Sequence, residues 1–339
     1  MTKRKISAEI IAGSLNEHGQ KITTWILTYP RIIHAEMMTH RVFSRNAASS
    51  RAIPALKLIA DVEADPFVPV AFQKEHKGMQ GTEYIEETHL VRSTWIEASK
   101  NAVASAKAMT NRDECTKQLT NRLLEPFQWY TAIFTSTETS NFFNLRCPQY
   151  TFPSGQMDDY VYKSRKDFLS FVPLPMEASD YDDWTDLDWL KRNKGQGEIH
   201  ISLLAEAMWD SMNEYEYKQL KAGEWHIPFS DRFDTNLAIR AAENCGLPKD
   251  TTADEVKIKI ATARCARVSY NNFEGKDDYE ADIDLFGRLL TRPYTALNGD
   301  TYSESDPKHM SPSEHCAKAG EDDSWSGNFR GFVQLRAEL

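Results

Sequence analysis

The sequence has few cysteines and no long apolar run. Its five cysteines are scattered among 339 residues and form no Cys-x-x-Cys pair, which argues against a disulfide scaffold or structural zinc and favours a reducing cytoplasm. No apolar run approaches the roughly 20 residues of a membrane span. The basic start Met1–Ile6 lacks the apolar stretch of a signal peptide. We therefore expect a cytoplasmic protein with no membrane partner.

Positive charge is also scarce overall. The chain carries 40 Lys and Arg against 50 Asp and Glu, a formal net charge of −10. Nonspecific nucleic-acid binding depends on neutralising many phosphates, so we expect no nucleic-acid partner. A chain of 339 residues is long enough to bury a large core, in one elaborate domain or in two.

One segment departs from this acidic balance. Residues 39–51, here called the signature segment, contain three arginines, a histidine, three serines and an asparagine, and no acidic residue. Guanidinium groups bind phosphate oxygens well, because they stay charged and donate two parallel hydrogen bonds. Charge runs are usually solvated surfaces, so composition alone leaves open whether this one binds an anion or is a solvated loop.

The spacing of its polar residues resembles a known family pattern. His-Arg-x-x-Ser-x-Asn-x-x-Ser-x-Arg is similar to the signature of the flavin-dependent (alternative) thymidylate synthases. Three family positions differ, because Thr39 replaces an Arg, Ala47 a Glu and Ala52 a Tyr. The matching residues are His40, Arg41, Ser44, Asn46, Ser49 and Arg51.

This resemblance implies two sets of ligand contacts. The flavin contacts implied within the signature segment are His40, Arg41 and Asn46. The implied contacts to a nucleotide substrate are Ser49, Ser50 and Arg51, together with Glu36 just before the segment.

Two further segments are similar to the same family. Residues 121–126, Asn-Arg-Leu-Leu-Glu-Pro, resemble its Ala-Arg-x-x-Leu-Pro segment. Residues 141–146, Asn-Phe-Phe-Asn-Leu-Arg, resemble its Asn-Phe-x-x-Leu-Arg helix. By this resemblance Arg122 contacts the substrate phosphate, Arg146 the pyrimidine ring and Asn141 the flavin.

The C-terminal part is similar to the segments with which members of this family begin. Residues 263–270, Ala-Arg-Cys-Ala-Arg-Val-Ser-Tyr, resemble its Ala-Ala-Arg-Val-Ser segment, and residues 309–315, His-Met-Ser-Pro-Ser-Glu-His, resemble its His-x-Ser-Pro-Phe-Glu-His segment. His and Glu are also metal ligands, but no further His or Cys set completes a site, so we expect no metal. The flavin contacts implied here are Ser269, His309, Ser311 and Glu314.

The order of these segments is inverted relative to the family, so the chain reads as a circularly permuted or rearranged member. Permutation is tolerated where the original termini lie close together at the surface. We expect one half, residues 1–147 and 198–230, to carry the signature segment and to bind nucleotide and flavin. Residues 250–339 would form the second half, matching the family's N-terminal segments.

Local patterns predict an α+β fold, an antiparallel sheet flanked by long helices in permuted order. Runs of β-branched and aromatic residues predict strands over 21–30 and 130–135. A helix is predicted to begin at about Asn141, with Thr139 or Ser140 as its N-cap. Further helices are predicted over residues 32–38, 87–112, 115–125, 203–220, 257–266 and 282–290.

Residues 148–197 resemble an insertion beside the presumed position of the pyrimidine. A loop of this length inside a domain is usually a functional lid or is disordered. Its many aromatic residues favour packing over disorder. A substrate lid and an oligomer interface are equally compatible with the composition.

No cysteine lies in a context typical of a nucleophile that attacks a pyrimidine. Cys147 follows Arg146, and a free cysteine is usually a buried thiol. In the resembled family reduced flavin does the difficult chemistry, while the protein supplies orientation and electrostatics. The resemblance thus implies transfer of a one-carbon unit from methylenetetrahydrofolate to C5 of dUMP by a homotetramer, with FAD re-reduced by NADPH.

Two arginines are assigned catalytic roles. Arg146 would stabilise the negative charge that develops on the ring, and Arg51 would anchor the phosphate and so orient the ring. We expect Arg51, Arg122 and Arg146 to converge on one nucleotide lying against the flavin.

Departures from the family leave two alternatives open. Glu36 lies where relatives usually carry Gln, and a carboxylate beside a phosphate would be repulsive unless paired, for example with Arg31 or Arg41. One alternative is C5 hydroxymethylation or hydroxylation of another pyrimidine nucleotide such as dCMP. The other is a nucleotide- or flavin-binding protein without turnover.

Overall fold

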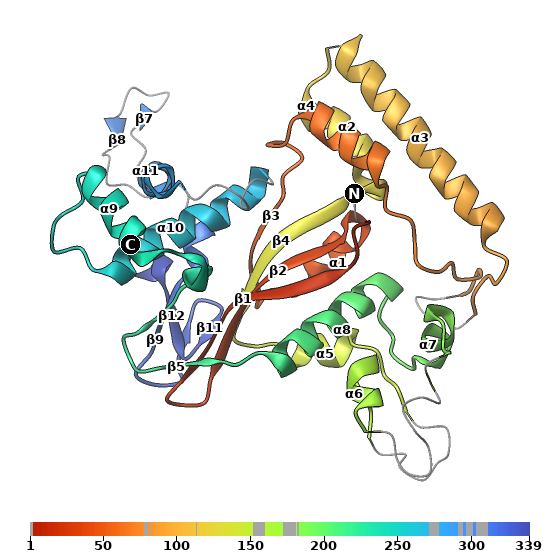
Figure 1. Ribbon diagram of the computed structural model, residues 1–339. Helices are drawn as coiled ribbons and strands as arrows, with labels where there is room; N and C mark the ends of the chain where they lie inside the picture. Colours follow the sequence, from red (N-terminus) through yellow and green to blue (C-terminus); the bar gives the residue numbers. More distant parts are fainter. Residues whose placement is uncertain are drawn as a thin grey trace.

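A five-stranded sheet lies at the centre of the molecule, with helices on both faces (Figure 1). The computed structural model describes residues 3–77, 81, 83–112, 114–151, 160–171, 181, 183–270, 278–290, 294–295, 301–302 and 311–339. Over these residues the chain is an α+β protein. The strand order is β3-β4-β2-β1-β5. The strands are β1 (Ser7–Asn16), β2 (Lys21–Pro30), β3 (Ser44–Ala47), β4 (Trp129–Ser136) and β5 (Lys218–Leu220).

The two strands predicted from sequence are confirmed as β2 and β4, which pair in register from Thr23↔Ser136 to Pro30↔Trp129. The predicted antiparallel sheet is confirmed for β1–β4, but at one edge β5 runs parallel to β1. The end of the predicted helix over 203–220 is also wrong, because β5 occupies its last residues. Helix α8 (Ile199–Glu214) ends before Tyr215, whose backbone is extended, and β5 follows.

One face of the sheet carries the larger apolar cluster. Trp25, Leu27 and Tyr29 alternate along β2 and are fully buried there, as period-two side-chain placement requires. The helices α2, α5 and α8 contribute to this cluster, and α3 packs against α2. Their bounds are α2 (Ala55–Ala64), α3 (His89–Asn111) and α5 (Ser140–Arg146).

Residues of the opposite parity, Ile26 and Ile133 among them, face a second cluster formed with three helices. These helices are α9 (Thr235–Asn244), α10 (Ala253–Arg267) and α11 (Tyr279–Leu290). The predicted helices over 257–266 and 282–290 are confirmed, although both begin earlier. For α10 the cause is a capping box between Thr252 and Glu255, which supplies the first turn with hydrogen-bond acceptors.

Short elements connect these layers. The predicted helix over 32–38 is confirmed as α1 (His34–Met37) behind a 3-10 turn, and residues 115–125 form α4 and a 3-10 helix. The expected side-chain cap of α5 is wrong: Thr139 precedes the helix, but its backbone is helical and its side chain accepts no capping bond. The remaining elements are α4 (Lys117–Thr120), α6 (Arg165–Leu169), α7 (Asp186–Arg192), β6 (Trp225–His226), β7 (Tyr294–Thr295), β8 (Thr301–Tyr302), β9 (Ala317–Ala319), β10 (Trp325–Ser326), β11 (Phe329–Arg330) and β12 (Phe332–Gln334).

Aromatic side chains from the segment 148–197 pack together, as their number predicted. The described part of this segment contributes α6 and α7, and Arg192 lies over the ring of Trp184 at 3.9 Å. Whether the segment is a lid or an interface stays a prediction. Within the described ranges, no helix has both the length and the apolar character needed to cross a bilayer. The buried aromatic residues of this cluster are Tyr150, Tyr162, Phe168, Tyr181 and Trp189.

A buried chain of hydrogen bonds ties the C-terminal segment to the sheet. His226 on β6 contacts Thr24 Oγ1 through Nε2 at 2.8 Å, and Thr24 Oγ1 lies 2.7 Å from Thr135 Oγ1. Thr135 in turn contacts His315 Nδ1 at 2.8 Å. Both histidines are fully buried, and burial lowers the pKa of His226 and of His315 to about 3.

Protonating these histidines is expected to destabilise the fold. Their pKa in an unfolded chain is about 6.5, so the stability of the neutral pair is complete above that pH. It is lost as the pH falls from about 6.5 towards about 3, by up to ~1.4 kcal/mol per pH unit for each histidine. Urea unfolding at about pH 7 and about pH 5 measures this loss.

The variant His315→Asn should reduce the pH dependence, because the amide can replace the bond to Thr135 without titrating. The matched control is Asn213→Ala at an exposed position of α8, which changes no titratable group and should leave the dependence unchanged. An equal pH dependence in all three proteins would contradict the assignment.

Candidate functional site

The signature segment is structured rather than a solvated loop. Its middle forms β3, which pairs with β4 from Ser44↔Thr135 to Ala47↔Ala132. The pairing continues where Ala48 N donates to Thr131 O at 3.0 Å. The chain then turns, because the carbonyl of Ser49 accepts hydrogen bonds from the amides of Ala52 and Ile53. Residues 48–53 are therefore a fixed turn at the edge of the sheet.

Asn121 holds this turn from inside. Its side-chain Nδ2 donates to Ser50 O at 2.7 Å and to Ile53 O at 3.0 Å, and the residue is fully buried. Sequence reasoning missed this role. Asn121 precedes Arg122 in the segment that resembles the family, and that position was the signal available.

The C-terminal segments contact the same turn. Ser49 N donates to Ser269 O at 3.0 Å, and Asn46 Nδ2 donates to Cys265 O at 3.4 Å. Further along, Gln334 Nε2 donates to Ser44 Oγ at 3.0 Å. Segments more than two hundred residues apart thus meet at the signature segment.

A cavity of about 710 Å³ opens beside this contact, here called the Arg51 cavity. Four of the predicted site residues line it, from both resembling segments: Asn46, Ser49, Arg51 and Ser269. Arg267 and Arg288 line it too and were not predicted. The remaining described residues of its lining are Ala52, Gln118, Ala266, Tyr270, Leu285, Leu289 and Pro312. None of these is acidic, so the cavity suits an anion.

Arg146 lies in a separate cluster with two other predicted residues. Its Nη1 donates to Glu36 Oε2 at 3.1 Å, and its Nε donates to His40 Nε2 at 3.2 Å. His40 is buried, with its ring edge-on to Phe142 at 4.8 Å between centroids. The guanidinium is thus held by a carboxylate and an imidazole and stays partly accessible to solvent.

Burial shapes the charges in this cluster. Burial and the nearby Arg146 both lower the pKa of His40, so the ring is neutral and accepts through Nε2. Burial raises the pKa of Glu36, and the positive charge of Arg146 opposes that rise. The sequence-based pairing of Glu36 with Arg31 or Arg41 is wrong. The partner is Arg146 at the end of α5, whose guanidinium reaches Glu36 on α1.

The expectation that Arg51, Arg122 and Arg146 converge on one cavity is wrong for a single chain. Arg51 lines a cavity against α10 and α11, on one side of the sheet, whereas Arg146 lies on α5 on the other side (Figure 1). The Arg122 side chain is 57% exposed and lies 3.6 Å from the carboxylate of Glu125. Neither Arg122 nor Arg146 lines the Arg51 cavity.

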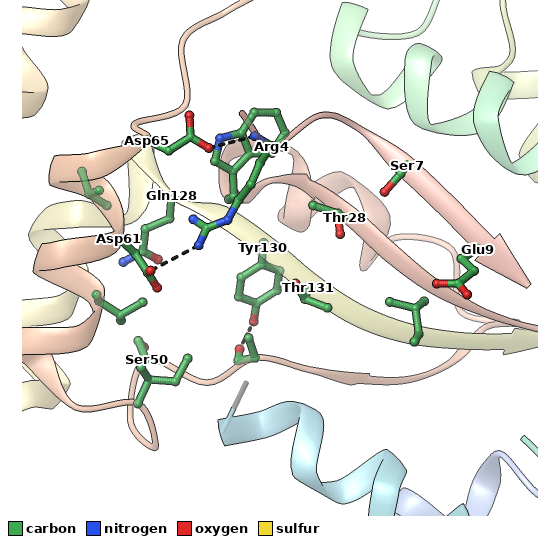
Figure 2. A pocket seen from close by; sticks show the side chains of 16 residues that line it. Arg4, Ser7, Glu9, Thr28, Ser50, Asp61, Asp65, Gln128, Tyr130 and Thr131 are labelled. Atoms are coloured by element: carbon green, nitrogen blue, oxygen red, sulfur yellow. Dashed lines mark hydrogen bonds and ion pairs between the residues drawn. The ribbon is translucent and has the colours of Figure 1, made fainter. Parts of the chain in front are cut away.

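Ser50 points to the other side of the turn, into a second cavity of about 550 Å³ (Figure 2). Arg4 crosses this cavity, with its Nη2 3.2 Å from Asp61 Oδ1 and its backbone N donating to Asp65 Oδ2 at 2.9 Å. Glu9 also lines it. The carboxylates make this cavity less suitable for a phosphate than the Arg51 cavity. Ser50 therefore lines a different cavity from its neighbours Ser49 and Arg51.

The other predicted site residues that the structure describes do not line the Arg51 cavity. Arg41 and Asn141 are exposed, and Glu314 forms an ion pair with Arg336. Ser311 opens a 3-10 helix, but its side chain and all of His309 lie outside the described residues. Their roles towards a flavin stay predictions. Among the described residues no group of three or more His, Cys, Asp or Glu side chains could hold a metal ion.

Cys147 is buried, as expected of a core thiol, and its burial raises the pKa of the thiol far above the usual range. A thiol in this state is a poor nucleophile, because the thiolate is the reactive form.

Comparisons with known proteins give little further guidance. No protein-family model matches the sequence, and no curated protein matches it. Among solved structures, the chain is similar to a UMP/dUMP methylase, PolB from Streptomyces cacaoi, bound with 5-Br UMP, at 14% identity over 62% of this chain and 90% of that chain, with a TM-score of 0.40. The same enzyme bound with 5-Br dUMP gives 13% identity, 63% and 93% coverage and a TM-score of 0.41. Similarity at this level assigns neither a family nor an activity.

Removing the Asn121 side chain should loosen the turn that carries Arg51. Asn121→Ala leaves the part-buried carbonyl of Ser50 and the buried carbonyl of Ile53 without their donor, which costs ~1–3 kcal/mol. Urea unfolding measures the loss, and trypsin should cleave after Arg51 faster than in the wild type. Asn101→Ala, at an exposed position of α3, is the matched control. Equal stability and equal cleavage in the two variants would contradict this role.

Proposed function

We propose that this chain is a flavin-dependent enzyme that transfers a one-carbon unit from methylenetetrahydrofolate to C5 of dUMP, using FAD and NADPH. One observation carries the proposal. Asn46, Ser49 and Arg51 of the signature segment line one cavity with Ser269, which belongs to a different segment resembling the same family. Two independent resemblances in the sequence therefore meet at one place in the fold.

The chemistry of the Arg51 cavity fits a phosphate-bearing ligand. Arg51 supplies a guanidinium, while Asn46, Ser49 and Ser269 supply amide and hydroxyl groups. These groups would hold the phosphate of FAD or of the substrate through charge-assisted hydrogen bonds. Bound flavin would supply the redox chemistry, for which the protein side chains have no equivalent.

Arg146 would act on the pyrimidine ring. Reaction at C5 moves negative charge onto a carbonyl oxygen of the pyrimidine, and a guanidinium directed at that oxygen stabilises the charge. Glu36 and His40 are positioning residues in this scheme, because they hold the guanidinium through Nη1 and Nε. A donor fixed in advance need not reorganise as the charge forms.

The two sets of residues would meet between copies of the chain. Arg51 and Arg146 lie on different sides of the sheet in one chain, so one nucleotide can contact both only if a second copy contributes one of them. This is consistent with the homotetramer that the family resemblance implies.

A second candidate, C5 hydroxymethylation or hydroxylation of dCMP, is favoured by Glu36. A carboxylate accepts a hydrogen bond from the exocyclic amino group of cytosine, whereas it would repel the corresponding oxygen of uracil. Because Glu36 is paired with Arg146, its charge lies where the ring would bind. A binding protein without turnover is the remaining alternative.

Product analysis separates the three candidates. The protein is incubated with FAD, NADPH, methylenetetrahydrofolate and either dUMP or dCMP, and the nucleotide is analysed by mass spectrometry. We expect dUMP to gain a methyl group. A product from dCMP alone would contradict the thymidylate reaction and support the second candidate. If neither nucleotide gives a product, only the binding protein without turnover remains.

Complementation tests the shared site. Arg51→Ala and Arg146→Ala should each reduce turnover at least ~100-fold, and Arg146→Ala should still bind flavin. Co-expressed in equal amounts, the two variants should recover about one quarter of the wild-type activity, because random assembly of symmetric oligomers leaves that share of sites intact.

The control for this experiment pairs Arg51→Ala with the double variant Arg51→Ala/Arg146→Ala. No site can then contain an intact Arg51, so no activity should return. If Arg51→Ala and Arg146→Ala also fail to complement each other, the site is not shared between copies.

A further inference from the structure

Two guanidinium groups outside the signature segment line the Arg51 cavity. Arg267 comes from the end of α10 and Arg288 from the last turn of α11. With Arg51 they place three positive charges around one cavity, and no acidic side chain is among its described lining residues. Arg267 and Arg288 are paired with Asp282 and Asp284, carboxylates that do not line the cavity. The described lining itself is therefore positive, which favours an anion.

We propose that Arg51, Arg267 and Arg288 together bind the phosphate of a nucleotide, and that Arg288 is a determinant of affinity for it. The inference rests on the proposed function only in that the nucleotide is either FAD or the substrate monophosphate. Both offer the same chemistry, a phosphate that accepts several charge-assisted hydrogen bonds.

Arg267 is held in place before any ligand binds. Its Nε donates to Asp282 Oδ1 at 2.7 Å, and the other oxygen of this fully buried carboxylate accepts from Arg264 Nε at 2.6 Å. The bond uses Nε alone, so the two terminal nitrogens of Arg267 can donate to a ligand. A donor that is already ordered costs less entropy on binding.

Arg288 and Arg51 are the adaptable members. The Arg288 side chain is 68% exposed and pairs with Asp284 at 3.0 Å, one turn earlier on α11. Exposed pairs of this kind contribute little, so Arg288 can exchange Asp284 for a phosphate at low cost. Within the described part of the chain, the guanidinium of Arg51 makes no hydrogen bond or ion pair.

The rest of the cavity suits the remainder of a nucleotide. Tyr270, Leu285, Leu289 and Pro312 offer apolar and aromatic surface, while Asn46, Ser49 and Ser269 offer polar groups. The volume of about 710 Å³ lies within the range of roughly 300–1,000 Å³ typical of small-molecule sites. A planar ring beside the apolar residues would leave its phosphate beside the arginines.

Titration calorimetry with two pairs of ligands tests the inference. FAD is compared with riboflavin, which lacks its diphosphate and adenosine, and dUMP is compared with deoxyuridine, which lacks only its phosphate. Arg288→Gln should weaken the binding of at least one phosphorylated ligand by about 10-fold, equivalent to ~1.4 kcal/mol, and should leave its unphosphorylated counterpart unchanged. The pair that shows the loss identifies the source of the phosphate.

Arg51→Gln should show the same loss, whereas Arg240→Gln should show none, because Arg240 is exposed on α9 outside this cavity. Raising the salt concentration should weaken the binding of the phosphorylated ligand to the wild type more than to Arg288→Gln. Salt screens the charge of Arg288, which the variant lacks.

The inference is overturned if Arg288→Gln binds FAD and dUMP as tightly as the wild type, or if the wild type binds neither. These outcomes are distinct from failure of the proposed function. A phosphate-dependent loss in Arg288→Gln without any C5 product would support the site and reject the reaction. A C5 product together with unchanged affinity in Arg288→Gln would support the reaction and reject the phosphate site.

Discussion

The pairing of β3 with β4 is the constraint on which the candidate site depends. It fixes the signature segment to the edge of the sheet through Ala47, and the bond from Ala48 N to Thr131 O carries the order into the turn. From there the turn has buried Asn121 on one side and Ser269 on the other. Arg51 therefore projects from a rigid support, which is what precise contact with a small ligand requires.

Much of the fold could be predicted from local pattern. The strand over 21–30 combines β-branched and aromatic residues with a terminal proline, and it is buried almost continuously on both faces. Composition rather than alternation therefore predicted it. The ends of helices were harder to predict from the sequence. The pattern up to Leu220 continued past Glu214, where Tyr215 becomes extended and its ring packs against Gly13 of β1. This tertiary contact overrides a local preference and has no signature in the local sequence.

The candidate site was predictable only where residues fell into the family pattern. That pattern led to Asn46, Ser49 and Ser269, which the fold brings to one cavity. Arg288 belongs to no such pattern, and only the packing of α11 against α10 places it there. The partner of Glu36 was equally hidden, because Arg146 is 110 residues away in the sequence. The expected convergence of three arginines failed within one chain because Arg51 and Arg146 lie on different sides of the sheet, and the local pattern does not show on which side a residue lies.

A crystal structure with FAD and dUMP bound would test the central claim most directly. We predict a nucleotide phosphate within about 3 Å of the Arg51 guanidinium, with the pyrimidine ring of dUMP against Arg146 of a second copy. A structure in which dUMP contacts neither arginine, or in which Arg51 and Arg146 bind unrelated ligands, would contradict it.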